Sequence, residues 1–110
     1  MDGCRFYFVY NFKDMVQDIV NNKERSQFEY HEEGEIARLE YRFKNADMVL
    51  MHTEVPKVLE GRGIASRLAK FAFEQAKQQQ RKVLVYCPYI SSYLRRHPEY
   101  DELVEKDYNK

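Results

Sequence analysis

The sequence predicts a single α/β domain, of the α+β kind, in which helices pack on a mixed sheet. Three observations indicate this class. The chain has 110 residues, which is enough for one ordinary domain and too few for two. Residues 27–43 alternate between apolar and polar side chains, as in an antiparallel hairpin. Residues 48–87 follow the order strand, helix, strand, which is typical of two parallel strands joined by a crossover helix.

The composition argues against several classes of protein. The chain carries 18 basic and 18 acidic side chains, so it lacks the positive excess expected of a nucleic-acid-binding protein. Its apolar stretches are far shorter than the ~20 residues that a membrane-spanning helix needs. The first residues also lack the basic and then apolar order of a secretory signal. We therefore expect a cytoplasmic protein that binds neither nucleic acid nor membrane.

The two cysteines indicate no metal site. Cys4 and Cys87 lie far apart in the chain and lack the spacing of metal ligands. A reduced intracellular protein without a bound metal is the simplest interpretation, although the two thiols could pair.

The first strands are predicted from alternation and turn residues. Gln27–His31 alternates, Glu33-Gly34 offers a turn, and Ala37–Phe43 alternates again, so residues 27–43 are expected to form a hairpin. After a turn, Met48–Val55 is apolar on both faces, as expected of a strand in the interior of a sheet. Pro56 ends that strand.

The second half of the chain alternates between helix and strand. Apolar residues recur every three or four positions from Arg62 to Gln80, which predicts an amphipathic helix. Val83–Cys87 is expected to be a short buried strand. Pro88 is suited to the first turn of a helix over Tyr89–His97, which Pro98 would stop.

The start of the chain is harder to assign. We expect residues 16–110 to form the domain and residues 1–15 to be an aromatic N-terminal extension or an edge strand. Met15–Val20 fits either a first strand or a short helix.

The strand–helix–strand unit brings chemistry-bearing residues to one edge of the sheet. If its strands are parallel, Glu54, the Gly61–Ala65 segment and Cys87 lie near the edge where open α/β sheets bind ligands. Glycines at the helix start let the backbone approach a ligand, and free amides there favour an anion such as phosphate. A plain turn is the alternative. Neither the dinucleotide fingerprint nor the Walker pattern is present.

Three blocks of sequence carry a resemblance to a known family. They are His52-Thr53-Glu54-Val55-Pro56 with Glu60-Gly61-Arg62-Gly63-Ile64-Ala65-Ser66-Arg67-Leu68, then Tyr86–Ile90, then Arg95–Tyr100. Together they resemble the GNAT superfamily, and in particular its small single-domain GNAT-like N-acetyltransferases, over roughly residues 16–105. The resemblance implies a mixed, mostly antiparallel sheet with a V-shaped splay between the parallel strands 48–55 and 83–87. It also implies acetyl-coenzyme A as cosubstrate and an unidentified primary amine as acceptor.

The resemblance further implies which residues hold the cosubstrate. The backbone near Val55 would pair with the pantetheine amides. Cys87, at the end of the second parallel strand, could be a small residue packed beside the pantetheine arm. Main-chain amides would cradle the pyrophosphate, and these belong to Gly61, Arg62, Gly63, Ile64, Ala65 and Ser66. The Arg62 side chain could contact a phosphate or simply be solvated. Glu60 stands where the superfamily usually has Arg or Gln, so we expect its carboxylate to point away.

Acetyl transfer to an amine needs a proton acceptor and an acid for the leaving thiolate. Glu54 could be the base if it is partly buried, and His52 could substitute for it or relay the proton. The alternatives are a solvent-facing carboxylate and a histidine packed on the sheet. Tyr93 is implied as the acid, with a core role as the alternative. Cys87 could carry the acetyl group covalently, but direct transfer is favoured over that route.

Two other functions remain open at this point. The chain could be a non-catalytic module that binds or senses an acyl-coenzyme A. It could also be a small interaction module without a cofactor, using Phe6–Tyr10 as its contact surface.

Overall fold

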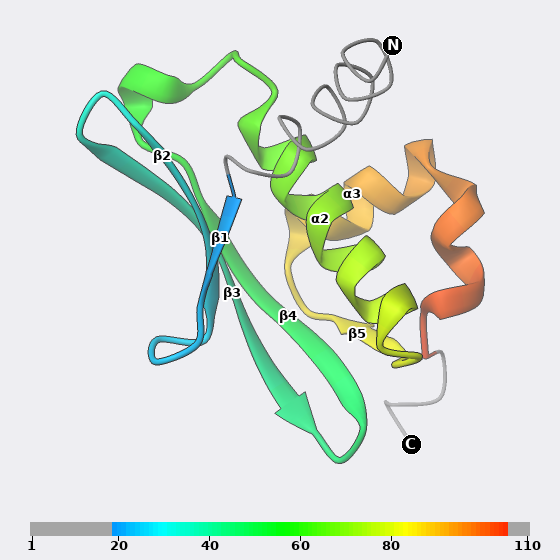
Figure 1. The fold of residues 1–110 in the computed structure, drawn as a ribbon. Helices are drawn as coiled ribbons and strands as arrows, with labels where there is room; N and C mark the ends of the chain where they lie inside the picture. Colours follow the sequence, from blue (N-terminus) through cyan, green and yellow to red (C-terminus); the bar gives the residue numbers. More distant parts are fainter. Residues whose placement is uncertain (1–18, 106–110) are drawn as a thin grey trace, which may run out of the picture.

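Five strands form one sheet in the computed structural model, which describes residues 19–105 (Figure 1). The strands lie in the order β1-β2-β3-β4-β5, and α2 and α3 lie together on one side of the twisted sheet. The strands are β1 (Ile19–Asn22), β2 (Gln27–Glu32), β3 (Glu35–Lys44), β4 (Asp47–Glu54) and β5 (Val83–Val85). The helices are the 3₁₀ turns η1 (Lys57–Leu59) and η2 (Pro98–Leu103), and the α-helices α2 (Ile64–Gln78) and α3 (Pro88–Arg96).

The predicted hairpin is confirmed. β2 and β3 pair antiparallel, and only Glu33 and Gly34 connect the paired residues Glu32 and Glu35. Glu33 has φ 55° and Gly34 has φ 77°, the two left-handed residues of a type I′ turn. Such a turn matches the twist of the strands that it joins. Glycine tolerates this conformation without strain.

β4 is the interior strand that its apolar sequence predicts. Met48, Val49 and Leu50 are all buried, which fits pairing with β3 on one side and with β5 on the other. The pairing with β5 is parallel, as predicted, and its last aligned pair is Leu50 with Val85. β5 itself lies at one end of the sheet order among the described residues.

A bulge in β4 marks the point where β4 and β5 part. Glu40 of β3 aligns with His52 and the next residue, Tyr41, aligns with Leu50, so Met51 is an extra residue in β4. Bulges bend the strand that carries them and increase its twist. The Tyr86 amide donates to the Leu50 carbonyl at 3.0 Å, and beyond that point β4 continues to Glu54 with β3 alone among the described strands. The two parallel strands therefore splay.

The second half of the chain follows the predicted order with shorter elements. The strand expected over 83–87 ends at Val85. After the hydrogen bond donated by the Tyr86 amide the chain turns, and Cys87 becomes the N-cap of α3. The helix expected from Arg62 begins at Ile64, because Gly63 is its N-cap with a left-handed backbone. The helix expected over 89–97 covers Pro88–Arg96.

The core lies between the sheet and the two α-helices. The predicted apolar stripe of α2 is buried throughout, and its buried members are Ile64, Leu68, Ala69, Ala72, Phe73 and Ala76. Phe73 stacks on Tyr100 with ring centroids 5.0 Å apart. The burial of Ile64 anchors the start of α2 in the core, and with it the end of the segment that leads into the helix.

The assignments made for the start of the chain fall largely outside the described residues. Residues 1–15, which include Cys4 and Phe6–Tyr10, lie outside the described residues. Of the segment Met15–Val20, only Ile19 and Val20 are described, and both belong to strand β1. Between residues 19 and 105, none of the helices has the length and apolar character to cross a membrane.

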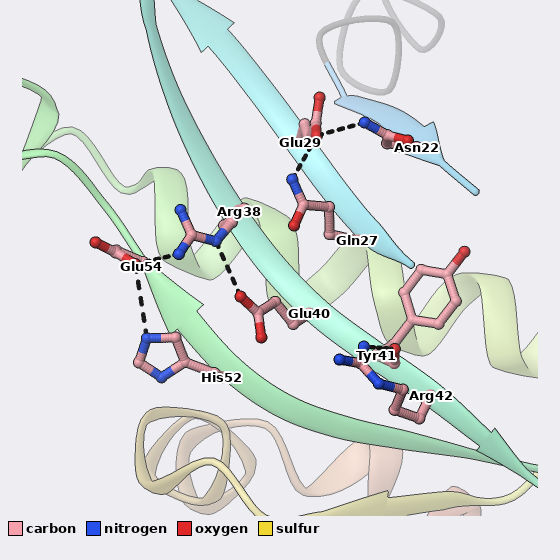
Figure 2. A network of polar contacts seen from close by, with 9 residues as sticks. All are labelled: Asn22, Gln27, Glu29, Arg38, Glu40, Tyr41, Arg42, His52 and Glu54. Carbon is pink, nitrogen blue, oxygen red and sulfur yellow. Dashed lines mark hydrogen bonds and ion pairs between the residues drawn. The ribbon is translucent and has the colours of Figure 1, made fainter. Parts of the chain in front are cut away.

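A buried carboxylate ties β1 to β2 on the sheet face opposite the core. Glu29 is only 5% exposed. Its carboxylate accepts hydrogen bonds from Gln27 and from Asn22 (2.9 Å), as Figure 2 shows, and lies 2.8 Å from His31 Nε2. Burial alone would raise the pKa of Glu29, but the side-chain hydrogen bonds from Gln27, His31 and Asn22 outweigh it. The pKa therefore lies below its ordinary value of 4.5.

Because the pKa of Glu29 is lowered on folding, its ionised form stabilises the fold above pH 4.5, and this stabilisation is lost as the pH falls through the folded-state pKa. We expect Glu29→Gln to lower the free energy of unfolding by about 1–2 kcal/mol at pH 7. The difference from wild type should shrink in urea titrations at successively lower pH. The exposed Glu35→Gln variant is the control and should match wild type. An equal loss for Glu29→Gln at pH 7 and at pH 3.5 would contradict this account.

Candidate active site

The segment between β4 and α2 is shaped by two glycines. Gly61 has φ 82° and Gly63 has φ 75°, and a side chain at such angles costs about 1 kcal/mol or more. A Cβ atom added to either glycine would meet no atom of residues 19–105 within 4 Å. The glycines are therefore required by the backbone conformation, and the described residues leave the space in front of them open.

The start of α2 offers uncapped amides next to these glycines. No side chain in the described part of the chain caps the helix at Gly63, and the Arg67 amide donates the first helical hydrogen bond to the Gly63 carbonyl at 3.1 Å. The amides of Ile64, Ala65 and Ser66 precede that bond, so the helix itself gives them no acceptor. Amides in this position, together with the helix dipole, favour a bound anion.

A pocket of about 230 Å³ lies at this place. It extends from the end of β4 to the first turn of α2, and its lining residues are Val55, Leu59, Glu60, Gly61, Gly63, Ile64, Ala65 and Tyr89. Four residues that the sequence assigned to the cosubstrate loop, and Val55 with them, thus meet at one cavity. Glu60, expected to point away, contributes to the lining as well.

Tyr89 is a pocket residue that the sequence argument assigned no role. It belongs to the first turn of α3, and its hydroxyl lies 2.9 Å from the Ser66 hydroxyl of α2. The contact joins the starts of the two helices. The sequence could have indicated this role, because Tyr89 follows Cys87 by two residues. The first turn after β5 must face the same sheet edge as the first turn of α2.

Cys87 lies where β4 and β5 have parted. Its thiol is free and its residue is 3% exposed. The sulfur lies 3.4 Å from the Thr53 hydroxyl of β4. Cys87 does not itself line the pocket, so the structure places it beside the splay, in contact with the strand that ends at the cavity.

The side chains of Glu54 and His52 lie on the other face of the sheet. Thr53 aligns with the fully buried Leu39, whereas Glu54 aligns with Arg38, so alternation turns Glu54 away from the core. Glu54 accepts a hydrogen bond from Arg38 at 2.6 Å and lies 3.8 Å from His52 Nε2 (Figure 2). The Glu54 side chain is 52% exposed. It therefore has little of the partial burial on which its role as a base was made to depend. The end of β4 lies near the Gly61–Ala65 segment, as expected for Glu54. The Glu54 carboxylate itself points towards Arg38.

Tyr93 belongs to the aromatic core. It is 2% exposed, and its ring stacks on Phe73 with centroids 6.2 Å apart and on His97 with centroids 4.1 Å apart. Burial, with a smaller contribution from Glu99, raises the pKa of Tyr93 to about 12. The phenol is therefore protonated at neutral pH, but Tyr93 does not line the pocket.

Arg62, between the two glycines, is directed at the β2–β3 turn. Its Nη1 donates to the Glu32 carboxylate and lies 3.5 Å from a Glu33 carboxylate oxygen. Its direct contact with a phosphate stays a prediction. Within residues 19–105, no three His, Cys, Asp or Glu side chains come together as a metal site.

Comparisons with known proteins identify the family of the chain. Residues 27–103 match a family described as GCN5-related N-acetyl-transferase. The protein NATD1 of Mus musculus is 35% identical over 83 residues, which cover 73% of this chain and 76% of the relative. NATD1 of Danio rerio is 34% identical over 91 residues, which cover 78% of this chain and 83% of the relative.

The fold has a counterpart among solved structures. The solution structure of a GCN5-like protein from Staphylococcus aureus superposes with a TM-score of 0.63 at 24% identity, over 79% of this chain and 86% of that one. This match supports the fold, and the family match covers the hairpin, the bulged strand, the glycine segment and both α-helices. The chain belongs to the GCN5-related N-acetyltransferase family.

Proposed function

We propose that the chain is an acetyl-coenzyme A-dependent N-acetyltransferase of the cytoplasm that transfers an acetyl group directly to a primary amine. One observation carries the proposal. The end of β4, whose edge towards β5 is left open by the described strands, borders one pocket together with the two left-handed glycines and the start of α2. That combination offers main-chain groups both to an extended amide-containing arm and to an anion.

The residues present fit this cosubstrate. The amides of Gly61, Arg62, Gly63, Ile64, Ala65 and Ser66 are proposed to bind the pyrophosphate. The described residues leave open space in front of both glycines, which admits the pyrophosphate without a Cβ clash. The backbone at Val55 would pair with the pantetheine arm, because β4 has no β5 partner beyond Leu50 among the described strands. Cys87 would flank that arm from the α3 side.

The cosubstrate supplies an acetyl thioester. In the proposed reaction the neutral amine nitrogen bonds to the acetyl carbon, the carbon–sulfur bond breaks, and the thiolate leaves. Glu54, with His52 as relay or substitute, is proposed to take the proton from the amine, which would then approach the thioester from the sheet face opposite the pocket, through the splay between β4 and β5. Arg38 fixes the orientation of the Glu54 carboxylate through its 2.6 Å hydrogen bond.

A phenol is proposed to protonate the leaving thiolate. Tyr93 is the residue that the family resemblance implies, but Tyr89 is the tyrosine of α3 that lines the pocket. Tyr89→Phe and Tyr93→Phe therefore belong in the same assay. The position of Tyr89 makes it the stronger candidate, because an acid must reach the sulfur to act on it.

A non-catalytic acyl-coenzyme A binding module is the second candidate. Two observations favour it. Glu54 is engaged by Arg38 on the face away from the core, and Tyr93 is buried in an aromatic stack. Coenzyme A binding without thiol release in the presence of mixed primary amines would select this candidate. Thiol release would select the transferase.

The glycine conformation is tested by Gly63→Ala. The added methyl group meets no neighbour, but the left-handed backbone disfavours alanine by about 1 kcal/mol, so the segment must shift or carry strain. We expect coenzyme A affinity, measured by calorimetry, to fall at least about fivefold. Asn45→Ala in the distant β3–β4 turn, where φ is 57°, is the control and should bind like wild type. Wild-type affinity in Gly63→Ala would show that the helix start does not hold the ligand.

The proton acceptor is tested by Glu54→Gln, which keeps the size of the side chain but removes its basicity. We expect kcat for thiol release to fall about 100-fold or more, the range usual for general bases. Coenzyme A affinity should not change, because the carboxylate lies on the other sheet face from the pocket.

Cys87→Ala separates direct from covalent transfer. Direct transfer predicts that this variant remains active, since the thiol then serves only to pack beside Thr53. An inactive Cys87→Ala variant, together with acetylated wild-type protein accumulating without acceptor, would overturn direct transfer.

A further inference from the structure

Arg62 is the one residue between the two left-handed glycines, and its side chain reaches a hairpin turn about 30 residues earlier in the chain. Its guanidinium donates to Glu32 and approaches Glu33, at sequence separations of 30 and 29 residues. Arginine at a phosphate-binding loop would ordinarily direct its charge at the ligand. Here that charge is already paired with carboxylates of the β2–β3 turn.

Glu32 is in turn held by a core residue. Its other carboxylate oxygen accepts a hydrogen bond from the Tyr30 hydroxyl at 2.6 Å. Tyr30 is 8% exposed and belongs to the core, and the Arg67 guanidinium of α2 lies 4.9 Å from the centre of its ring. The contact with Glu32, followed by burial, raises the pKa of Tyr30, so its hydroxyl remains a donor at neutral pH. Glu32 thus links a fixed tyrosine to Arg62.

The segment around Arg62 needs such a link. Leu59 is 0% exposed and Ile64 is 2% exposed, so both ends of the segment are anchored in the core. The residues between them, 60–63, are exposed, and neither glycine has a side chain to pack. The Glu60 amide donates to the Lys57 carbonyl at 3.2 Å, and the Gly63 carbonyl accepts from the Arg67 amide at 3.1 Å. Among the described residues, the conformation of Gly61 and Arg62 between them is therefore set by their backbone preferences and by the contacts of the Arg62 side chain.

We propose that Glu32 is a positioning residue: through Arg62 it holds the Gly61–Gly63 amides in the geometry that binds the cosubstrate pyrophosphate. This inference rests on the proposed function. It assigns the Arg62 side chain to the protein rather than to a phosphate. According to this inference, the β2–β3 turn influences cosubstrate affinity although it does not line the pocket.

The proposal and direct phosphate contact by Arg62 predict opposite changes in coenzyme A affinity when the Glu32 charge is removed. If the guanidinium served the phosphate, removing the Glu32 charge would release it and reduce repulsion of a polyanion, so affinity would rise. If Arg62 holds the segment, removing either partner loosens it, and affinity falls although a negative charge has been removed.

The test is a double-mutant cycle on Glu32→Gln, Arg62→Gln and the double variant, with calorimetry of coenzyme A and steady-state kinetics with acetyl-coenzyme A. Each single variant is expected to raise Kd and KM about three- to fivefold with kcat unchanged, and the double variant to be no worse than either single one. Glu35→Gln is the matched control. Glu35 lies opposite Glu32 in the same hairpin and takes no part in this relay, so its variant should bind as well as wild type or slightly better.

Three results would overturn the inference. Glu32→Gln could bind coenzyme A as tightly as wild type, or more tightly. The losses in the two single variants could add in the double variant, which would make the residues independent. Wild type and Glu35→Gln could both fail to bind coenzyme A, and that result would contradict the proposed function as well. Thermal unfolding of each variant without ligand establishes that the compared proteins are folded, as we expect because neither side chain is fully buried.

Discussion

β4 can pair with β5 only as far as Leu50, and the candidate site depends on this limit. The extra residue Met51 in β4 bends the strand, so the ladder that begins at Met48 and Val83 ends after three aligned pairs. A continuous parallel ladder would satisfy every backbone group of β4 and leave no main-chain donors for a ligand. Because pairing stops early, the end of β4 keeps one edge that the described strands leave open. The 3.4 Å contact between the Thr53 hydroxyl and the Cys87 sulfur connects the two segments across that gap.

The second half of the site follows from backbone conformation rather than from charge. The chain is electrically balanced, and the arginine nearest the glycines is paired with two carboxylates. In the proposed function, attraction of an anion therefore falls to amides and to the dipole of the 15-residue helix α2. These groups are fixed before any ligand arrives, since the first turn of α2 is anchored by Ile64 in the core and by the Ser66 contact to Tyr89. A preformed set of donors loses little freedom on binding.

Local patterns predicted the elements well. Alternation placed the hairpin, the Glu33-Gly34 turn appeared where expected, and the apolar stripe located α2 to within two residues. The glycines marked the segment that lines the pocket. These features depend on neighbours in sequence, and periodicity reports such neighbours directly.

Features that depend on register or on distant contacts were not predictable from the residues. Nothing in the sequence marks Met51 as a bulge, yet the aligned pairs around it decide that Glu54 faces Arg38 and that Thr53 faces the core. The partners of Arg62 come from a turn that only the folded sheet brings near. Tyr89 and Tyr93 are one helical turn apart, and only the packing of α3 shows that the first lines the pocket while the second stacks on Phe73.

The central claim is that main-chain amides at the start of α2 and at the end of β4 bind coenzyme A. Backbone amide spectra of the ¹⁵N-labelled protein, recorded by NMR during a titration with coenzyme A, test it most directly. The account predicts saturable shifts at Val55, Gly61, Gly63 and Ser66, with the amides of β1 and the β3–β4 turn unmoved. Absence of shifts at the glycines, or shifts confined to another face of the sheet, would contradict it.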